Sequence, residues 1–166
     1  MNSKKIMTSF LAVLICSTVF AQLQRTVKCP DFDIDILDGK VNANIIPQST
    51  NGQIMEEFPC FSNEEKKGTT AKSGAGVFYK DRDVYFYTDR HYVEIGPAFK
   101  GKMSIKLLGV ERNSLFKVLG APEVKDVNWD AFQTSYGILI LYYDKSSKVD
   151  KIQFSSENAN TIHLYQ

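Results

Sequence analysis

The sequence predicts an α+β domain, with one antiparallel sheet built from two tandem strand-helix-hairpin repeats and the helices packed on one face. Three observations lead to this fold class. The chain is similar to itself at an offset of 62 residues, several segments alternate apolar and polar side chains before turns, and two short segments carry helix-capping signals. The expected domain spans residues 22–166, with repeat units of about residues 38–97 and 98–156.

The self-similarity is clearest where residues 39–41 fall on residues 101–103, because both begin with Gly-Lys followed by an apolar residue. With small gaps, residues 85–89 also fall on residues 141–144. We interpret this pattern as a tandem duplication. The alternative is a chance match between two β-rich stretches, because apolar strands resemble one another.

Each unit is expected to begin with a strand. In the first unit Val41, Ala43 and Ile45 alternate with asparagines, and residues 103–107 of the second unit repeat the alternation. A period of two is typical of a strand with one buried face. The sequence therefore predicts a strand before each helix.

A short helix is expected next in each unit. In the first, Thr50 and Gln53 have the spacing of a capping box, in which each side chain accepts a hydrogen bond from the other residue's backbone N–H. In the second, an apolar helical face precedes a glycine that ends the helix and a proline that prevents its continuation. These residues are Leu115, Val118, Leu119, Gly120 and Pro122.

A polar loop and two strands complete each unit. The loops are expected over residues 62–76 and 123–130. The two strands of each unit are separated by a short polar connection typical of β-hairpins. They are expected over residues 84–87 and 92–95 in the first unit and over residues 138–143 and 149–154 in the second.

The C-terminal tail is polar after Ser155 until residues 162–165, which read Ile-His-Leu-Tyr. Two outcomes are open for it. The tail either docks as an edge strand or frays.

Residues 1–21 read as a cleavable secretory signal peptide. Lys4 and Lys5 precede an apolar run, and Val19 and Ala21 stand three and one residues before the expected cut. The alternative is a membrane anchor, but the apolar run of about 15 residues is shorter than the roughly 20 that span a bilayer. We therefore expect a periplasmic or secreted protein with no stable membrane insertion after cleavage.

Cleavage would change the charge balance of the chain. Two lysines would be lost, so that eighteen basic side chains would face nineteen acidic ones, a net charge of −1 in place of +1. This balance lacks the positive excess that drives sequence-independent binding to nucleic acid. No nucleic-acid partner is expected.

Two cysteines remain after cleavage, Cys29 and Cys60, and each stands beside a proline. Outside the cytoplasm such a pair persists as a disulfide. Two free thiols are the alternative, whereas a metal site is disfavoured because no histidine lies near either cysteine. Cys16 would carry the lipid of a lipoprotein, but the preceding Ile15 is larger than the usual small residue.

The chain offers little catalytic chemistry. Of its two histidines, His91 falls in an expected hairpin turn and His163 falls near the C-terminus. The sequence contains no Gly-x-Ser-x-Gly elbow, no phosphate-cradling loop and no His-Glu-x-x-His helix. We therefore expect a protein that is not an enzyme, with no catalytic residue, no cofactor and no metal site.

Aromatic residues crowd both predicted hairpins. Because neighbouring residues of a strand point to opposite faces, some rings can fill the core while others lie on the far face of the sheet. Tyrosine on an open face offers a large contact area with a polar tip, which suits a protein-binding surface. We predict a partner-binding role for Tyr85, Tyr87, Tyr92 and Tyr143, with core packing as the alternative, and core positions for Trp129 and Phe132.

The second unit carries a pattern of short motifs. Residues 119–122 read Leu-Gly-Ala-Pro, Trp129 and Tyr136 follow, and residues 144–149 read Asp-x-x-x-Lys-Val. This pattern resembles the repeat of the β-lactamase inhibitory protein family and of the small lipoprotein of the outer-membrane β-barrel assembly machinery. The resemblance implies two repeats that form a concave sheet gripping a protein partner.

The resemblance covers roughly residues 105–155 and, more weakly, residues 40–96. The chain departs from the family pattern, because a strand is expected before each helix and one helix is expected per unit where the family has two. In addition, no small residue precedes a cysteine as in a lipoprotein signal, and the first unit has Phe58-Pro59 in place of the Leu-Gly-x-Pro ending. The resemblance therefore bears on the fold more than on the partner.

Together these features favour an exported, non-catalytic protein-binding or inhibitor domain that uses an aromatic sheet face. A periplasmic immunity protein against a secreted toxin is one alternative. A cell-envelope assembly or structural factor is another, and a small envelope hydrolase is the least favoured.

Overall fold

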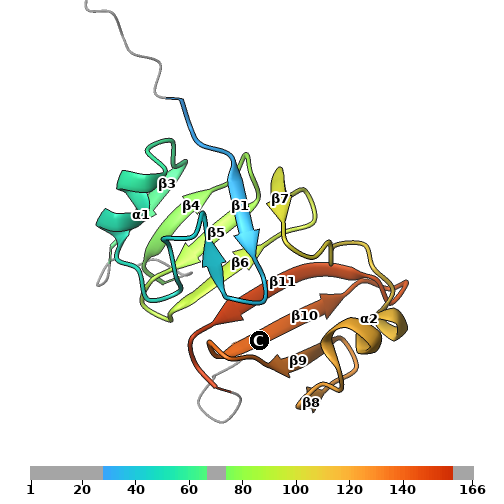
Figure 1. The fold of residues 1–166 in the computed structure, drawn as a ribbon. Coiled ribbons are helices and arrows are strands. Elements are labelled where there is room, and N and C mark those ends of the chain that lie inside the picture. The colour runs from blue at the N-terminus through green and yellow to red at the C-terminus, as the bar shows by residue number, and fades with distance from the viewer. Residues whose placement is uncertain (1–27, 67–73, 159–166) are drawn as a thin grey trace, which may run out of the picture.

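The computed structural model describes residues 28–66 and 74–158, so the expected signal peptide lies outside the described residues. Within the described part, the fold is α+β and consists mostly of antiparallel sheet with two helices (Figure 1). The helices are α1 (Asn51–Glu57) and α2 (Arg112–Leu119).

The larger sheet has eight strands in the order β3-β4-β5-β6-β11-β10-β9-β8, and every neighbouring pair is antiparallel. Its first half comprises β3 (Asn63–Glu65), β4 (Gly76–Tyr79), β5 (Val84–Tyr87) and β6 (Tyr92–Ile95). Its second half comprises β8 (Val124–Lys125), β9 (Trp129–Gln133), β10 (Ile138–Tyr143) and β11 (Val149–Ser155).

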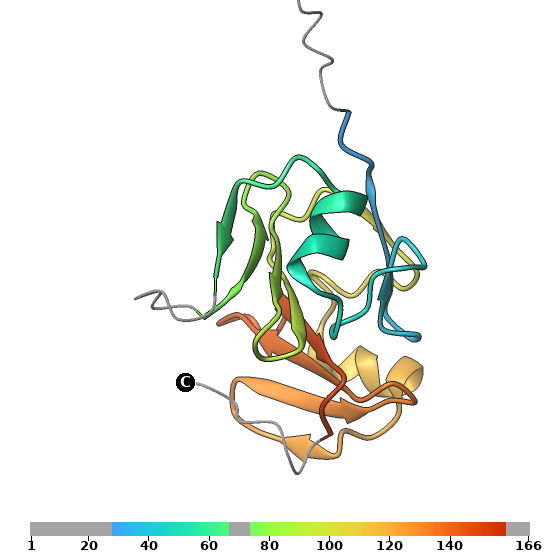
Figure 2. The ribbon, with the colours of Figure 1, turned by 90° about the vertical axis from the view of Figure 1, so that its left-hand side faces the viewer.

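The two halves meet where β6 pairs with β11, which places Glu94 opposite Gln153. The two expected hairpins are confirmed, because β5 pairs with β6 and β10 pairs with β11. The sheet is strongly twisted, so that the strands of the first half run at a steep angle to those of the second (Figure 2).

One face of the large sheet packs against both helices. Since side chains alternate along a strand, Val84 and Phe86 of β5 point to this core face and are buried. The same buried cluster includes Ile54 of α1, Phe58 just after it, and Leu115 of α2. Burying an aliphatic or aromatic side chain of this size contributes about 1.5–3 kcal/mol, so this cluster is the main source of stability.

A second, smaller sheet lies on the same side as the helices, in the order β2-β1-β7. It comprises β1 (Phe32–Asp35), β2 (Lys40–Val41) and β7 (Gly101–Met103), and β1 pairs in parallel with β7. The ring centroid of Phe32 lies 4.3 Å from that of Phe58. The small sheet therefore closes the core over the helix side of the large sheet.

Cys29 and Cys60 form a disulfide, as the sequence predicts, with their Cα atoms 5.5 Å apart. Cys29 precedes β1 and Cys60 follows α1. The bond therefore ties the start of the small sheet to the chain that leaves the first helix.

The predicted capping box of α1 is confirmed. The Thr50 hydroxyl accepts the backbone N–H of Gln53 at 3.3 Å, and the Gln53 side-chain oxygen accepts the backbone N–H of Thr50 at 2.9 Å. Both bonds satisfy donors that a helix start leaves without an intrahelical partner.

Replacing Thr50 with alanine is expected to lower the free energy of unfolding by about 1 kcal/mol, because one N-terminal donor loses its acceptor. Urea unfolding followed by circular dichroism measures the change. Glu56→Ala, at an exposed position of the same helix, is the control and is expected to change stability by less than about 0.5 kcal/mol. Equal stability of the Thr50→Ala chain and the wild type would contradict the contribution of the cap.

The second helix ends as predicted, at Gly120, whose φ of 79° suits a residue without a side chain. Its predicted apolar face is wrong at Val118, which is 58% exposed. Leu115 is buried, and Phe116 and Leu119 pack against the core from the neighbouring direction. The buried face of the helix is therefore centred between Leu115 and Phe116. Val118 lies on the other side of Leu115 and faces solvent.

The predicted strands that open each unit are wrong in extent. β2 ends at Val41, because Asn42 and Ala43 have positive φ and turn the chain so that Val41 bridges Ile45. In the second half, β7 ends at Met103. Most of the residues that alternate between apolar and polar in these segments therefore lie in turns. Their apolar side chains point inward because the backbone curves there.

The observed order of elements differs from the predicted strand-helix-hairpin unit. Each helix is followed by four antiparallel strands, β3 to β6 after α1 and β8 to β11 after α2. The short strands β3 and β8 lie within the segments expected to be polar loops. β1, β4 and β9 were not expected from the sequence.

Candidate binding surface

The face of the large sheet that points away from the helices, which we call the open face, carries a group of aromatic side chains in its first half. These side chains, the aromatic cluster, are Phe78, Tyr85, Tyr87 and Tyr92. They lie on this face because they alternate along their strands with buried residues such as Phe86 and Val93. The structure therefore brings together three of the four tyrosines predicted to bind a partner.

The strand register sets the geometry of the aromatic cluster. Phe78 stands opposite Tyr85, and Tyr87 stands opposite Tyr92. The rings of Tyr87 and Tyr92 stack with centroids 4.5 Å apart, and the Phe78 centroid lies 5.2 Å from that of Tyr87 and 6.1 Å from that of Tyr85. The four rings thus form one contiguous cluster across three strands, in which Phe78 is buried and the three tyrosines are partly exposed.

The phenols of the cluster stay protonated at neutral pH. Burial, followed by the negative charge of Glu94, raises the pKa of Tyr87 to about 12. Burial also raises the pKa of Tyr92, and burial together with a hydrogen bond to Asp83 raises the pKa of Tyr85. Each tyrosine of the cluster therefore keeps a neutral hydroxyl group, which can donate or accept a hydrogen bond.

Next to the aromatic cluster, a network of polar and charged side chains crosses the open face at the centre of the sheet. Gln153 Nε2 donates to Glu94 Oε2 at 2.6 Å, and the Tyr142 hydroxyl donates to Gln153 Oε1 at 2.8 Å. Lys151 Nζ lies 3.4 Å from Glu94 Oε2 and 4.3 Å from the centroid of the Tyr142 ring. These contacts fix the side chains, so this part of the surface is pre-organised.

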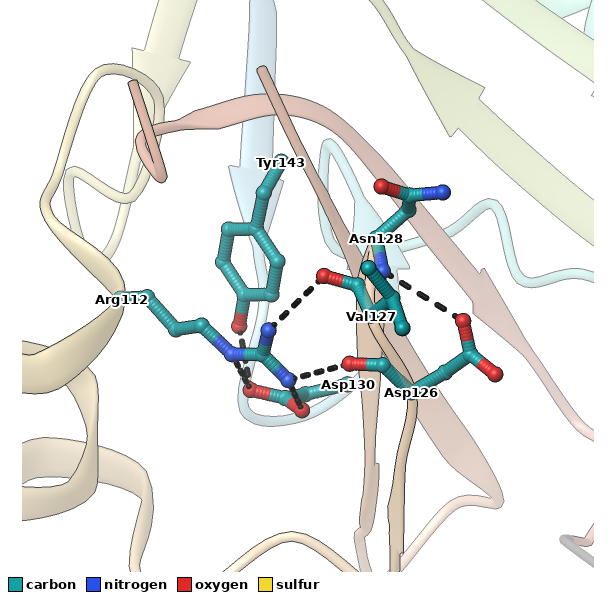
Figure 3. Close-up of polar contacts among 6 residues, drawn as sticks. All are labelled: Arg112, Asp126, Val127, Asn128, Asp130 and Tyr143. Atoms are coloured by element: carbon teal, nitrogen blue, oxygen red, sulfur yellow. Dashed lines mark hydrogen bonds and ion pairs between the residues drawn. The ribbon is translucent and has the colours of Figure 1, made fainter. Parts of the chain in front are cut away.

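Tyr143 lies apart from the other three predicted tyrosines, because it packs against the core on the helix side of the sheet. Its hydroxyl donates to Asp130 Oδ2 at 2.8 Å (Figure 3). Burial, followed by the hydrogen bond to Asp130, raises the pKa of Tyr143. The surroundings of this ring are those of an internal polar cluster.

The centre of that cluster is an ion pair between Arg112, at the start of α2, and the fully buried Asp130 of β9 (Figure 3). Arg112 Nε donates to Asp130 Oδ2 at 2.9 Å, and its Nη2 donates to the other carboxylate oxygen. The guanidinium also donates to the backbone carbonyls of Asp126 at 2.6 Å and Val127 at 3.0 Å.

In these contacts, the polar groups of Arg112 and Asp130 bond to partners within the protein. The hydrogen bond to Asp130 raises the pKa of Arg112, which is charged at every accessible pH. The Arg112 guanidinium carbon also lies 4.7 Å from the centroid of the Tyr143 ring. The arrangement fixes α2 to the β8–β9 hairpin.

The two residues predicted to be core differ in their surroundings. Phe132 is 2% exposed and belongs to the main core, as predicted. Trp129 is partly buried and packs on the open face, against a separate small cluster of Ala131, Ile138 and Ile140, which we call the apolar trio. This trio occupies the second half of the open face.

His91 lies at the turn between β5 and β6 and has a φ of 51°. Its Nδ1 is 3.6 Å from Glu157 Oε1, and both side chains are exposed. Among residues 28–66 and 74–158, no group of three or more histidine, cysteine, aspartate or glutamate side chains is placed to hold a metal ion. The second histidine, His163, lies outside the described residues.

A cleft of about 580 Å³ lies between β7 and the turn that joins β10 to β11. Phe99, Met103 and Lys106 line it together with Asp144. The Asp144 carboxylate accepts the backbone N–H of Lys148 at 2.9 Å, so it serves the turn. None of the four predicted tyrosines lines this cleft.

Several residues of the open face were missed by the sequence reasoning. Phe78 lies in a strand whose four residues are all buried, so no alternation reveals which face each side chain occupies. Lys151, Gln153 and Glu94 come together through the pairing of β6 with β11, which joins residues distant in the sequence. The period-two alternation within residues 149–154 is the signal that could have placed Lys151 and Gln153 on one face.

Comparisons with protein-family models, with curated proteins and with solved structures found no match for this chain. In the part of the chain that the structure describes, no helix is long and apolar enough to cross a membrane. The chemistry of the open face is therefore the basis for a proposed function.

Proposed function

We propose that this chain is an exported, non-catalytic domain that binds another protein through the aromatic cluster. The observation that carries the proposal is the gathering of Tyr85, Tyr87 and Tyr92 on a sheet face that the helices leave open. Export is proposed from the signal-peptide pattern at the start of the chain.

The chemistry of the cluster suits protein recognition. Tyrosine combines contact area with a polar tip and few rotatable bonds, so ordering it on binding costs little entropy. Here the rings stand on paired strands and contact one another, which restricts them further. Rigid aromatic side chains of this kind are frequent among the residues that carry most of the energy of an interface.

A carboxylate beside the cluster indicates what the partner could supply. Glu65 lies on the open face, and its charge contributes to the raised pKa of Tyr87. Among the described residues, Glu65 Oε2 is a buried side-chain atom without a hydrogen-bond partner. Because an unsatisfied buried acceptor is costly, a hydrogen-bond donor or a basic side chain of the partner would be stabilised there.

We also propose that the two halves of the chain arose by duplication of a unit with one helix and four antiparallel strands. The matching order of elements and the repeated Gly-Lys motif support this. The resemblance of the second half to the β-lactamase inhibitory protein repeat supports a gripping sheet. It does not identify the partner.

Replacing both Tyr85 and Tyr87 with alanine is expected to weaken partner binding at least tenfold, because truncation of a central tyrosine commonly costs an interface about 1–2 kcal/mol. The measurement is quantitative capture from the envelope fraction by immobilised residues 22–166, followed by mass spectrometry and titration of the protein captured. A secreted toxin as that protein would identify the immunity version of the function.

The matched control is Leu37→Ala/Val118→Ala, which removes two exposed apolar side chains away from the open face. The control chain is expected to bind like the wild type. Undiminished capture by the tyrosine variant would contradict the proposal. So would a loss of stability of more than about 3 kcal/mol in that variant, because a loss of this size is typical of core side chains.

A further inference from the structure

The strand β7 forms one edge of the small sheet, because β1 is its only strand partner in the described part of the chain (Figure 1). The backbone N–H of Ser104, just after β7, donates to the Ile34 carbonyl of β1 at 2.8 Å. Backbone groups of alternate residues point to the same side of a strand, so Lys102 also bonds toward β1. The N–H and C=O groups of Gly101 and Met103 therefore point away from β1.

These four backbone groups border the cleft between β7 and the turn that joins β10 to β11, since Gly101 and Met103 both line it. None of the four groups forms a hydrogen bond with another described residue. The cleft volume of about 580 Å³ lies in the range of pockets that hold ligands. Unpaired N–H and C=O groups along a strand edge are a template on which another chain can pair.

The cleft beside this edge also offers apolar contact. Phe99, Met103 and Leu108 line it and are only partly buried, while Val149 forms a more deeply buried part of its wall. A Cβ atom at Gly101 would come 2.4 Å from the Phe99 ring, so the absence of a side chain there lets this ring lie directly against the edge. An apolar side chain of an added strand would gain burial by contacting these residues.

The charge around the edge is predominantly positive. Asp144 and Asp150 line the cleft, but one carboxylate oxygen of Asp144 accepts the backbone N–H groups of Ser146 and Lys148 at 2.8 and 2.9 Å. Among the described residues, no carboxylate forms an ion pair with the three exposed lysines of the edge and the cleft, Lys102, Lys106 and Lys148. These lysines attract an acidic segment, and they disfavour β7 of a second copy because like charges on paired strands repel.

We propose that β7 binds an extended, acidic segment of a partner protein, which adds a fourth strand to the small sheet and fills the cleft. The backbone of the segment pairs with Gly101 and Met103, and its apolar side chains lie on Phe99 and Leu108. Its carboxylates approach the lysines of the cleft. This site is separate from the aromatic cluster, because the small sheet lies on the helix side of the large sheet and the cluster lies on the open face.

The probe is an octapeptide with blocked ends in which valine alternates with glutamate, and its binding to the purified protein is measured by titration calorimetry. Met103→Pro removes the free N–H of the edge without removing a bond to β1, and proline is tolerated at such a position of an edge strand. It is expected to bind the octapeptide at least about tenfold more weakly than Met103→Ala, because a peptide carbonyl loses its donor. Met103→Ala is the matched control, since it loses the same side chain and keeps the N–H.

A second pair of variants tests the charge at exposed positions where the fold tolerates substitution. Lys106→Glu/Lys148→Glu is expected to weaken binding of the octapeptide and to strengthen binding of its counterpart with lysine in place of glutamate. The control is Lys80→Glu/Lys117→Glu, which makes the same change in net charge at exposed positions that do not line the cleft. This control is expected to bind both peptides like the wild type.

Amide hydrogen exchange in the wild type tests the mode of binding. The amide protons of Gly101 and Met103 are expected to become protected when the octapeptide is added, whereas that of Lys102 is protected with and without it. No binding of the octapeptide, or binding that leaves Gly101 and Met103 unprotected, would overturn the proposal. Displacement of the octapeptide by dodecanoate at a much lower concentration would overturn it in favour of an amphipathic small molecule as the ligand of the cleft.

Discussion

Replacing Asp130 with alanine is expected to lower the free energy of unfolding by about 3–4 kcal/mol, because it leaves the guanidinium of Arg112 without its buried counter-ion. Asp130 is fully buried and accepts hydrogen bonds from Arg112 and from the Tyr143 hydroxyl. Its loss therefore removes the acceptor of three donor groups, Nε and Nη2 of Arg112 and the Tyr143 hydroxyl, at a fully buried position. Urea unfolding, with the slope of the transition compared between variants, measures the change.

Asp126→Ala is the matched control, because Asp126 contacts Arg112 through its backbone carbonyl, which the substitution retains. This control is expected to cost less than about 1 kcal/mol. The double variant Arg112→Met/Asp130→Ala is expected to be more stable than the sum of the single changes predicts, by about 0.5–3 kcal/mol, since the two side chains contact each other. Strict additivity would show that the ion pair does not couple α2 to the β8–β9 hairpin.

Removing the disulfide as Cys29→Ala/Cys60→Ala is expected to lower the free energy of unfolding by about 3–4 kcal/mol in the chain-entropy model. The bond joins residues separated by 31 positions, so it restricts the unfolded chain substantially. The alanines avoid a free thiol that could react with another chain. The measurement is urea unfolding of residues 22–166 with and without a reducing agent.

The reducing agent is the internal control of this experiment. It is expected to bring the wild type down to the stability of the double variant and to have no effect on the variant itself. A wild type that is indifferent to reduction would show that Cys29 and Cys60 are not bonded in solution.

The hairpins and the first helix could be predicted from the sequence because their signals are local. Residues 84–87 and 92–95 alternate around a short polar turn, and Thr50 and Gln53 stand at the spacing that one helical turn requires. The same local reasoning failed at Val41 and Ile45, where a tight turn with positive φ at Asn42 produces an alternation like that of a strand.

The short strands could not be predicted from the sequence, for a different reason. β3 and β8 are two or three polar or exposed residues long, and they extend only because each has a neighbouring strand to pair with. β1 pairs in parallel with β7, a partner roughly 70 residues away in the sequence. Pairing between distant segments leaves no periodic signal within either of them.

The candidate surface, like the fold, could be predicted only in part from the sequence. The sequence by itself determined that Tyr85 and Tyr87 share one face of a strand and that Phe86 lies on the other, because strand alternation is a property of the backbone. Only the tertiary structure decided which of these faces is covered by helices. It also decided that Tyr143 points to the helix side, since that depends on how β6, β11 and β10 pair and on where α2 places Arg112. A strand fixes the relative orientation of its own side chains, but burial is a contact with other parts of the chain, and those contacts exist only once the sheet and the helices have come together.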